Sequence, residues 1–516
     1  MFASGRAVSF SLLRRPRKKL LIAFVSFIGA VAAFLVIEHF RGPWMLDRWK
    51  KRMTAQGEVL DIDKLARPSL PPESNGLPQL TWVAGQLSLL PMQLQPPTAR
   101  YTAPGKVVAI TLVNHWPLSD AKGTNTTWVV VAEQLAVLDG PIQEVLHILA
   151  HERFSANLHY RSGFSLVIMH LTRLRSVAQA LSAATLHDIH QGQMDTAFAS
   201  LKGMLALVEV EKDEPIIISQ LVRIALAHIT FATTWQALQR EGWTDGQLAQ
   251  LQNAWADLKF PLAMEKALCM ERAIAAIEYE RCRTSDLPLS QMLDPGAVGG
   301  APGPALLSSQ WLVDVMDDVP GALRDGAFTP IWKFAWSHHD ELHYCKIIQR
   351  MIDAHREVFA RRAGATLPQR MSRIEDTAMG PYDALRFAVA PAIYPALMRA
   401  FHKAWIAQTA ADLAVTALAI KRFELRHGRL PASLHELVPE FLPQCPLDGM
   451  DAKPLRYCVE SDATFLLYSI GLDGKDDGGD GTHSNGGHFN FHYGRDLVWP
   501  QPASDVEILG WKNSRK

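Results

Sequence analysis

An uninterrupted apolar run near the N-terminus constrains this chain more than any other feature. Residues Leu20–Ile37 carry no charge, and a helix of this length, rising about 1.5 Å per residue, matches the hydrocarbon core of a bilayer. The run therefore predicts a single transmembrane helix over 20–37. Basic residues cluster directly before it, at Arg14, Arg15, Arg17, Lys18 and Lys19. Such a cluster favours residues 1–19 as a basic tail that stays in the cytoplasm.

The residues in and after the run leave two interpretations open. Five basic residues between 41 and 52 weaken the charge asymmetry, and Trp44 and Trp49 suit the headgroup zone of a membrane. The tripeptide Ala30-Val31-Ala32 is typical of a signal-peptidase site, so a cleaved signal peptide competes with an uncleaved anchor. In both interpretations the body is exported. We expect a single-pass protein of the cell inner membrane with a periplasmic body, in contact with the bilayer through 20–37.

The basic residues of the chain are concentrated at its N-terminus. The chain has 52 basic and 52 acidic residues, but residues 1–52 hold eleven of the basic and two of the acidic ones. The rest is therefore acidic, which argues against nucleic acid as a partner, since binding it needs a basic surface. Apolar residues make up 48% of the chain, as in globular proteins.

Composition divides the chain beyond the span into five segments. We predict a Pro-rich connector over 38–126, a helical domain over 127–286, a Gly/Pro loop over 287–305, a second helical segment with one long helix over 306–427, and a C-terminal module over 428–516. The fold class is mainly α, with a single N-terminal transmembrane helix, a body of helical hairpins and a small α+β module.

Helical periodicity is clearest within 127–286. Apolar residues follow one face of 166–186, and a turn at Gln191-Gly192 precedes a second helix, so this stretch predicts a hairpin similar to one tetratricopeptide unit. Thr244 and Gln247 predict a capping box for a later helix. Further helices are expected over 261–282, 306–323, 330–363, 382–390 and 395–427, with Gly428 ending the last one.

Histidines offer the first candidates for chemistry. His147 and His151 share a helical face, as do His187 and His190, but no Glu directly follows the first histidine as the zinc helix motif requires. The run 338–343, His-His-Asp-Glu-Leu-His, matches no ligand spacing. We interpret these histidines as surface or satisfied core residues. No nucleophile-elbow, phosphate-loop or dinucleotide motif occurs, so no catalytic or cofactor-binding residue is assigned.

The residues from 428 onward predict a small α+β module. Ser433 and Glu436 form a possible second capping box, for a short helix. The runs 455–460 and 464–469 are strand-like and closely spaced, which indicates a hairpin. Cys445 and Cys458 flank this piece and either form a disulfide in an oxidising compartment or stay free.

An acidic, glycine-rich loop follows the hairpin. Four carboxylates lie close together there, and glycines between them allow tight folding. Such crowding is repulsive unless the acids face water or share a cation, and Ca²⁺ accepts carboxylate and carbonyl oxygens in flexible numbers. The loop is therefore either a solvated acidic turn or a calcium site. The candidate metal ligands are Asp473, Asp476, Asp477 and Asp480.

Several short motifs within 412–480 occur in one order. They are a His-Gly-Arg-Leu-Pro turn after a helix, Leu-x-x-Leu-Val-Pro, Pro-Leu-Asp-Gly at 446–449, Pro-Leu-Arg-Tyr at 454–457 and Leu-Tyr-Ser-Ile-Gly-x-Asp-Gly at 467–474. With them the segment resembles the globular half of the major, G-like pseudopilins of type II secretion. The resemblance implies Ca²⁺ at the same four aspartates. The body is similar to envelope proteins of planctomycetes and verrucomicrobia that carry this tail.

These observations favour a membrane-anchored, exported structural or interaction protein with a calcium-stabilised, pseudopilin-like tail. One alternative is an accessory component of a type II secretion or type IV pilus-like system. The other is a metal-dependent enzyme that uses the histidine-rich helices. The expected partners are the lipid bilayer and envelope or secretion proteins, with neither nucleic acid nor a small-molecule substrate inferred.

Overall fold

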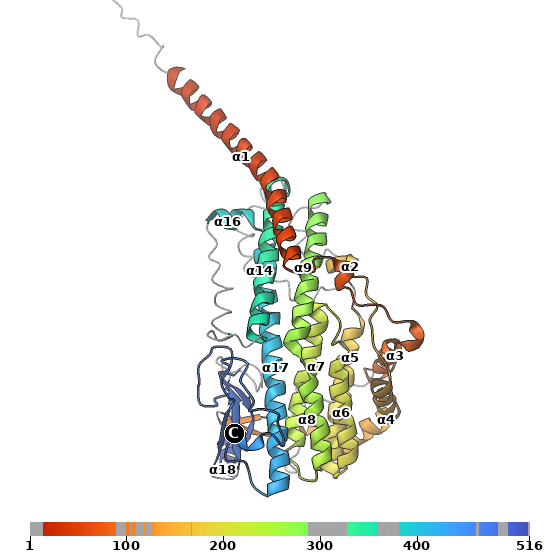
Figure 1. The fold of residues 1–516 in the computed structure, drawn as a ribbon. Coiled ribbons are helices and arrows are strands. Elements are labelled where there is room, and N and C mark those ends of the chain that lie inside the picture. Colours follow the sequence, from red (N-terminus) through yellow and green to blue (C-terminus); the bar gives the residue numbers. More distant parts are fainter. Residues whose placement is uncertain are drawn as a thin grey trace, which may run out of the picture. The chain divides into compact units, whose positions relative to one another are not determined.

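The protein is mainly helical, with a small content of strand (Figure 1), as the sequence predicts. The computed structural model describes residues 14–88, 100–103, 105–109, 118–119, 125–126, 128–166, 168–286, 328–359, 367, 381–460, 464–482 and 494–513. The predicted Gly/Pro loop 287–305 and the predicted helix 306–323 lie outside these residues. The chain divides into two units. Unit 1 comprises Met1–Val59, Ala275–Lys346 and Met379–Pro395, and unit 2 comprises Leu60–Ile274, Ile347–Ala378 and Ala396–Lys516.

Unit 1 is built on helix α1 (Arg14–Ala55). Its apolar part is long and apolar enough to cross a membrane and is not buried by the rest of the chain, which confirms the predicted apolar helix over 20–37. The helix does not end there. Leu46, Trp49 and Met53 lie on its continuation and are buried, so residues 38–55 are not the expected connector. Trp49 is only 7% exposed, and its expected place in the headgroup zone is wrong because it packs inside unit 1.

The other elements of unit 1 come from distant parts of the sequence. Helix α13 (Thr329–Ile331) leads into the π-helical turn η6 (Trp332–Trp336), which packs against α1. Helix α14 (Ser337–Phe359) follows without a break, and α16 (Pro381–Arg386) precedes the long helix α17 (Ala390–His427). Only the first parts of α14 and α17, up to Lys346 and Pro395, belong to unit 1, and the rest of each helix belongs to unit 2. The helices predicted over 330–363, 382–390 and 395–427 are therefore present with shifted ends. Helix α17 begins earlier than predicted and includes Pro395.

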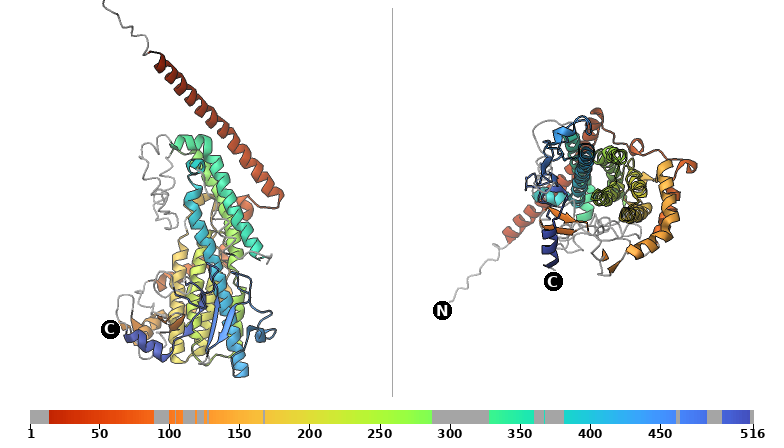
Figure 2. Two further views of the ribbon diagram at one scale, coloured as in Figure 1. Left: turned by 90° about the vertical axis from the view of Figure 1, so that its left-hand side faces the viewer. Right: turned by 90° about the horizontal axis from the view of Figure 1, so that it is seen from below.

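Unit 2 holds the helical hairpins. Helices α5 (His170–Gln191) and α6 (Met194–Glu209) pack closely, and Gly192 joins them in the left-handed conformation (φ +75°) that glycine adopts readily. Helix α7 (Ile217–Ala237) packs against both, as the end-on view in Figure 2 shows. The hairpin is thus present, while its likeness to a tetratricopeptide unit stays a prediction. Unit 2 also contains α2 (Ile62–Leu65), α3 (Leu77–Leu87), α4 (Trp128–His151), α8 (Asp245–Asp257) and the part of α9 (Phe260–Thr284) up to Ile274, with 3-10 turns η1 (Pro72–Ser74) and η4 (Tyr160–Ser165).

Helix α8 begins as predicted. The Thr244 hydroxyl accepts a hydrogen bond from the Gln247 amide at 3.2 Å, and the Gln247 side chain accepts one from the Thr244 amide at 3.0 Å. Both donors would otherwise be unsatisfied at the helix start. This confirms the first capping box.

Among its described residues, unit 2 also contains three small sheets. Strand β1 (Arg100–Ala103) pairs antiparallel with β2 (Lys106–Val108), which pairs in parallel with β8 (Gln501–Pro502). Strands β3 (Leu118–Ser119) and β4 (Asn125–Thr126) form a two-stranded pair. The order β5-β6-β7 describes the third sheet, in which β5 (Arg456–Val459) and β6 (Phe465–Ser469) form the predicted hairpin and β7 (Leu497–Trp499) was not predicted. Helix α18 (Asp505–Asn513) follows.

Two local predictions about the C-terminal module are tested by its geometry. Gly428 ends α17 with φ +67°, as expected. Ser433 makes no capping hydrogen bond at the 3-10 turn η7 (Leu434–Leu437), so the second capping box is wrong. The Glu436 carboxylate instead binds the Arg429 guanidinium at 2.8 Å and the Ala432 amide at 3.0 Å. Cys445 and Cys458 are free thiols in this structure.

Candidate functional site

The four predicted metal ligands lie on one loop directly after β6. Asp473, Asp476 and Asp477 are exposed, and Asp480 is half-buried. Three of the carboxylates accept hydrogen bonds from amides two residues ahead: Asp473 from Lys475 at 3.1 Å, Asp476 from Gly478 at 3.1 Å and Asp480 from Thr482 at 3.0 Å. Such local bonds are typical of aspartate in turns. The acids therefore shape the loop themselves.

A buried carboxylate that the sequence did not single out lies beneath this loop. Asp496, just before β7, is 1% exposed and accepts hydrogen bonds from the amides of Asp477 at 3.1 Å and Gly479 at 2.7 Å. Burial raises the pKa of Asp496 to about 6, the two amide bonds oppose the rise, and the charges of Asp476 and Asp477 add to it. Asp496 thus joins the loop to the sheet, and its negative charge is repelled by the acidic residues of the loop. In the sequence, only its position directly before an apolar strand could have indicated that Asp496 belongs to this site.

A second buried carboxylate, Asp448, connects the motifs of the module. It is 1% exposed and accepts hydrogen bonds from the Ser469 hydroxyl at 2.8 Å and the Ile470 amide at 3.1 Å. Arg456 donates to it at 2.9 Å, and the same guanidinium binds Asp451 at 2.6 Å. The segments around 448, 456 and 469 are therefore joined by the contacts of Asp448 and Arg456, which we call the hub.

Arg456 also reaches the acidic loop. Its Nε atom lies 3.6 Å from an oxygen of Asp476, and the other oxygen of Asp476 accepts a bond from the Tyr468 hydroxyl at 2.9 Å. Within the described part of the chain, no three or more His, Cys, Asp and Glu side chains are arranged to hold a metal ion. The four predicted aspartates lie on one loop, but among the described residues they do not form such a group. His483, His488 and His492 lie outside the described residues.

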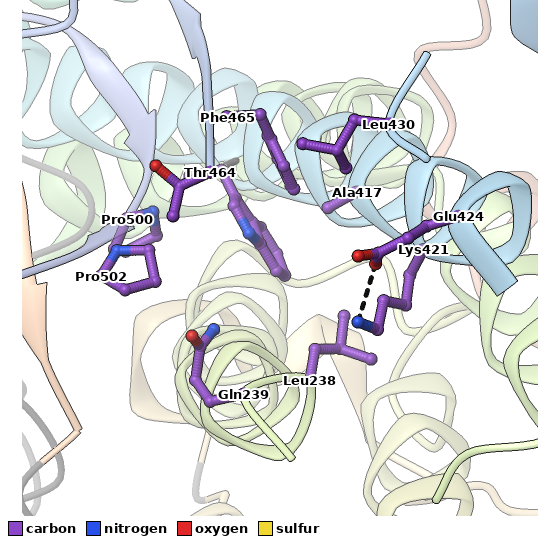
Figure 3. Close-up of a pocket in the computed structure, with 11 residues that line it drawn as sticks. Leu238, Gln239, Ala417, Lys421, Glu424, Leu430, Thr464, Phe465, Pro500 and Pro502 are labelled. Atoms are coloured by element: carbon purple, nitrogen blue, oxygen red, sulfur yellow. Dashed lines mark hydrogen bonds and ion pairs between the residues drawn. The ribbon is translucent and has the colours of Figure 1, made fainter. Parts of the chain in front are cut away.

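A small pocket lies between the helices of unit 2 and the C-terminal module (Figure 3). It has a volume of about 150 Å³. Lys421 and Glu424 of α17 form a 2.8 Å ion pair at one side of it (Figure 3). It is smaller than a typical ligand site of about 300–1,000 Å³, so it has room for no more than one small group beside that ion pair. The other lining residues are Leu238, Gln239, Ala417, Leu430, Thr464, Phe465, Trp499, Pro500 and Pro502.

In unit 1, two buried glutamates hold the continuation of α1, and we call these contacts the anchor clamp. Glu38 is 1% exposed; its carboxylate lies 3.0 Å from His339 Nε2 and accepts a bond from the Tyr382 hydroxyl at 3.2 Å. Glu341 on α14 is fully buried between Lys50 of α1 at 2.8 Å and Arg283 at 2.9 Å. A buried charge is costly unless paired, so the Glu38–His339 and Glu341–Lys50 contacts couple α1 to α14.

Asp340 lies between His339 and Glu341 on α14 and holds the start of α17. It is fully buried, and its carboxylate accepts bonds from the amides of Ala388, Val389 and Ala390 at 2.8, 2.8 and 3.0 Å. The Trp332 indole and the Tyr279 hydroxyl each donate to it at 3.1 Å. A carboxylate at a helix start satisfies amides that have no partner within the helix. This explains why α17 begins at Ala390.

The remaining histidine candidates make structural contacts. The His147 and His151 rings are exposed and 4.6 Å apart, and His151 Nδ1 lies 2.9 Å from the His147 carbonyl. His190 stacks on Trp128 at 4.2 Å. His343 stacks on Phe387 at 4.1 Å. The His187 Nε2 and His190 Nδ1 atoms are buried without a hydrogen-bond partner among the described residues, so these two rings are not the satisfied core residues that we expected.

Comparison with known proteins adds no further guide. No protein-family model matches the chain, and neither a curated protein nor a solved structure matches it.

Proposed function

We propose that this chain is a membrane-anchored, exported structural or interaction protein, in which one helix both spans the bilayer and mounts the body. The observation that carries the proposal is the continuity of α1 from its exposed apolar part into the anchor clamp. A flexible tether would let the body swing freely. A helix that enters a set of buried ion pairs instead fixes the orientation of the unit that it enters.

The energetics favour such a mount. Breaking a buried ion pair by removing one partner costs about 3–5 kcal/mol, because the other charge is left buried. Glu38 is buried between Arg41 of the same helix and His339, whose pKa is lowered by burial, and Glu341 is buried between Lys50 and Arg283. Release of α1 would remove His339 from Glu38 and Lys50 from Glu341, while Arg283 would stay on Glu341, so the cost is smaller than that of leaving a buried charge unpaired.

The C-terminal module is the proposed interaction part. Its support is the pseudopilin-like order of motifs, and the finding that Asp448 and Arg456 join three of them in one hub. The pocket beside Lys421 and Glu424 gives this part a recess for one small group. We assign binding rather than catalysis to it.

Calcium at the acidic loop belongs to the same proposal. Its support is electrostatic, since Asp476 and Asp477 both disfavour the charged form of Asp496. Ca²⁺ takes carbonyl and water oxygens alongside carboxylates, so Asp473, Asp476, Asp477 and Asp480 would supply only part of its coordination. The ion would offset the repulsion among acids that the turns leave exposed.

Limited trypsin digestion of the full chain in detergent micelles tests the mount. Lys50, Lys51 and Arg52 lie in α1, and we expect them to resist cleavage while the clamp is closed. Glu341→Ala leaves Lys50 and Arg283 without their shared partner, and cleavage at these sites should become at least tenfold faster. Equal cleavage in both proteins would refute the mount. Glu280→Ala, which removes only an exposed partner of Arg283, is the matched control.

A further inference from the structure

The end of the apolar run on α1 is surrounded by exposed aromatic side chains. Phe40 and Trp44 are 70% and 59% exposed on α1 itself. They lie about 4.5 and 10 Å beyond Ile37 along the helix. The interfacial zone of a bilayer is about 5–8 Å deep on each side of the hydrocarbon core. If residues 20–37 span the core, Phe40 is therefore placed within that zone, and Trp44 is placed just beyond it, with a side chain that leans back toward the helix N-terminus.

Turn η6 is held at the same level of α1. His39 Nδ1 lies 2.7 Å from the Phe334 carbonyl, and the rings of the two residues stack at 4.3 Å. Phe334 therefore lies beside residue 39, just past the apolar run. It is 45% exposed, and its neighbour Ile331 is 36% exposed.

Helix α16 adds a third element at this level. The Tyr382 ring packs edge-on against Phe34 at 5.9 Å, while its hydroxyl donates to Glu38. Tyr382 thus extends from the apolar side of α1 to its first buried charge, with 38% of its surface exposed. An apolar ring with a polar tip is the form of side chain that is enriched at membrane interfaces.

Close packing keeps these elements together. Gly42 of α1 approaches α14 so closely that an added Cβ would lie 3.1 Å from His338 Cβ and 3.2 Å from His339 Cδ2. The clamp pair His339–Glu38 closes the same contact. Turn η6 precedes α14 directly, so its position along α1 is fixed by this approach.

We propose that Phe40, Trp44, Ile331, Phe334 and Tyr382 form an interfacial surface that lies in the headgroup zone of an anionic bilayer. Single exposed apolar side chains are common on proteins, but five from three separate stretches of the chain gather here at the end of an apolar helix. Arg48 lies over the Trp44 ring at 5.4 Å and Arg41 is half exposed, so cationic groups accompany the aromatic ones. This composition favours anionic lipid headgroups. The inference rests on the proposed span and gives unit 1 its own contact with lipid.

Photocrosslinking of the full chain in liposomes of phosphatidylcholine and phosphatidylglycerol tests the inference. A benzophenone amino acid is placed at one position at a time: Phe334 on the surface, Phe27 in the span, and Thr54 as control. Thr54 is exposed on the same helix and lies about 25 Å beyond Ile37. We expect lipid adducts at 334 and 27, with at least tenfold less at 54.

The outcomes separate the inference from the proposed function. Adducts at 27 without adducts at 334 would overturn the interfacial surface and keep the span. Absence of adducts at both positions would overturn both. Equal adducts at 334 and 54 would also overturn the surface, because contact would then not depend on depth. Replacing phosphatidylglycerol by phosphatidylcholine should lower the yield at 334 and leave the yield at 27 unchanged.

Discussion

Asp340 in unit 1 and Asp496 in the C-terminal module are both buried aspartates that bind backbone amides, yet their surroundings differ. Five neutral donors surround Asp340. Asp496 has two amide donors and the charges of Asp476 and Asp477 nearby. A carboxylate among neutral donors fixes a structure. A carboxylate among other acids also responds to protons and cations.

Among the variants considered, removal of the Asp340 carboxylate should lower the unfolding free energy most. Asp340→Ala leaves three amides, an indole and a phenol without their acceptor in a buried site, and we expect a loss of more than about 4 kcal/mol of unfolding free energy. Burial raises the pKa of Asp340 and its amide bonds oppose that rise, so Asp340→Asn should cost less. Urea unfolding of the full chain in detergent measures both. A loss below about 1 kcal/mol for Ala would contradict the assigned role.

Removal of Arg456 should cause the second largest loss of unfolding free energy, because its guanidinium binds the acidic residues of the C-terminal module. Arg456→Ala leaves buried Asp448 with neutral donors only and removes the cation nearest to Asp476. We expect a loss of about 2–3 kcal/mol. Arg456→Lys keeps the charge without the two-pronged geometry and should lose roughly half as much. If the Ala variant unfolds like the wild type, the hub is not holding the module.

Calcium should stabilise the module and leave unit 1 unaffected. An ion at ten times its dissociation constant adds about 1.4 kcal/mol to the folded state. We expect a higher melting temperature with calcium than with chelator, and no shift in the double variant Asp476→Asn with Asp477→Asn. A calcium shift that survives this double substitution would place the ion elsewhere. No shift in the wild type would reject the calcium proposal.

The pH dependence of stability sharpens the contrast. The folded-state pKa of Asp496 is about 6, above the ordinary value of 3.8, so the folded module binds this proton more tightly than the unfolded chain. The stabilising contribution is full below pH 3.8 and is lost as the pH rises through about 6. Relative to the wild type, Asp496→Asn should therefore gain melting temperature between pH 4.5 and 7 without calcium. If the melting temperatures of the two proteins change with pH in parallel, the raised pKa of Asp496 is contradicted.

The smallest effect is expected at the tip of the acidic loop. Asp473 is exposed and, within the described part of the chain, binds the Lys475 amide alone, so Asp473→Asn should change the unfolding free energy by less than about 0.5 kcal/mol. Asparagine can form the same local turn. A loss above about 1 kcal/mol without calcium would show that the tip has contacts beyond this turn.

Local patterns in the sequence predicted local structure well. The hairpin of α5 and α6, the capping box at Thr244 and the pairing of β5 with β6 each depend on residues close in sequence. The box at Ser433 failed although its spacing was correct, because Arg429 holds the Glu436 carboxylate. A motif defined by Ser433 and Glu436 alone does not predict that a third side chain, Arg429, competes for the carboxylate.

Contacts between distant segments were out of reach of the sequence alone. The early start of α17 depends on Asp340, about fifty residues upstream. Likewise, β7 is a strand because it pairs with β6 across the intervening loop. The continuation of α1 carries charges and a proline that favour a connector, and only its partners Glu341 and His339 explain why it stays helical and buried. The four loop aspartates could be predicted as a group, but not Asp496 beneath them.

The proposal that a single span exports the body is tested most directly by labelling cysteines from outside the inner membrane. In a Cys458→Ser background, Val506→Cys places a thiol on α18, where the native side chain is 79% exposed, and Ser4→Cys places one before the span. A thiol reagent that cannot cross the inner membrane should label position 506 in spheroplasts and position 4 only after lysis. Labelling of 506 only after lysis would contradict the account.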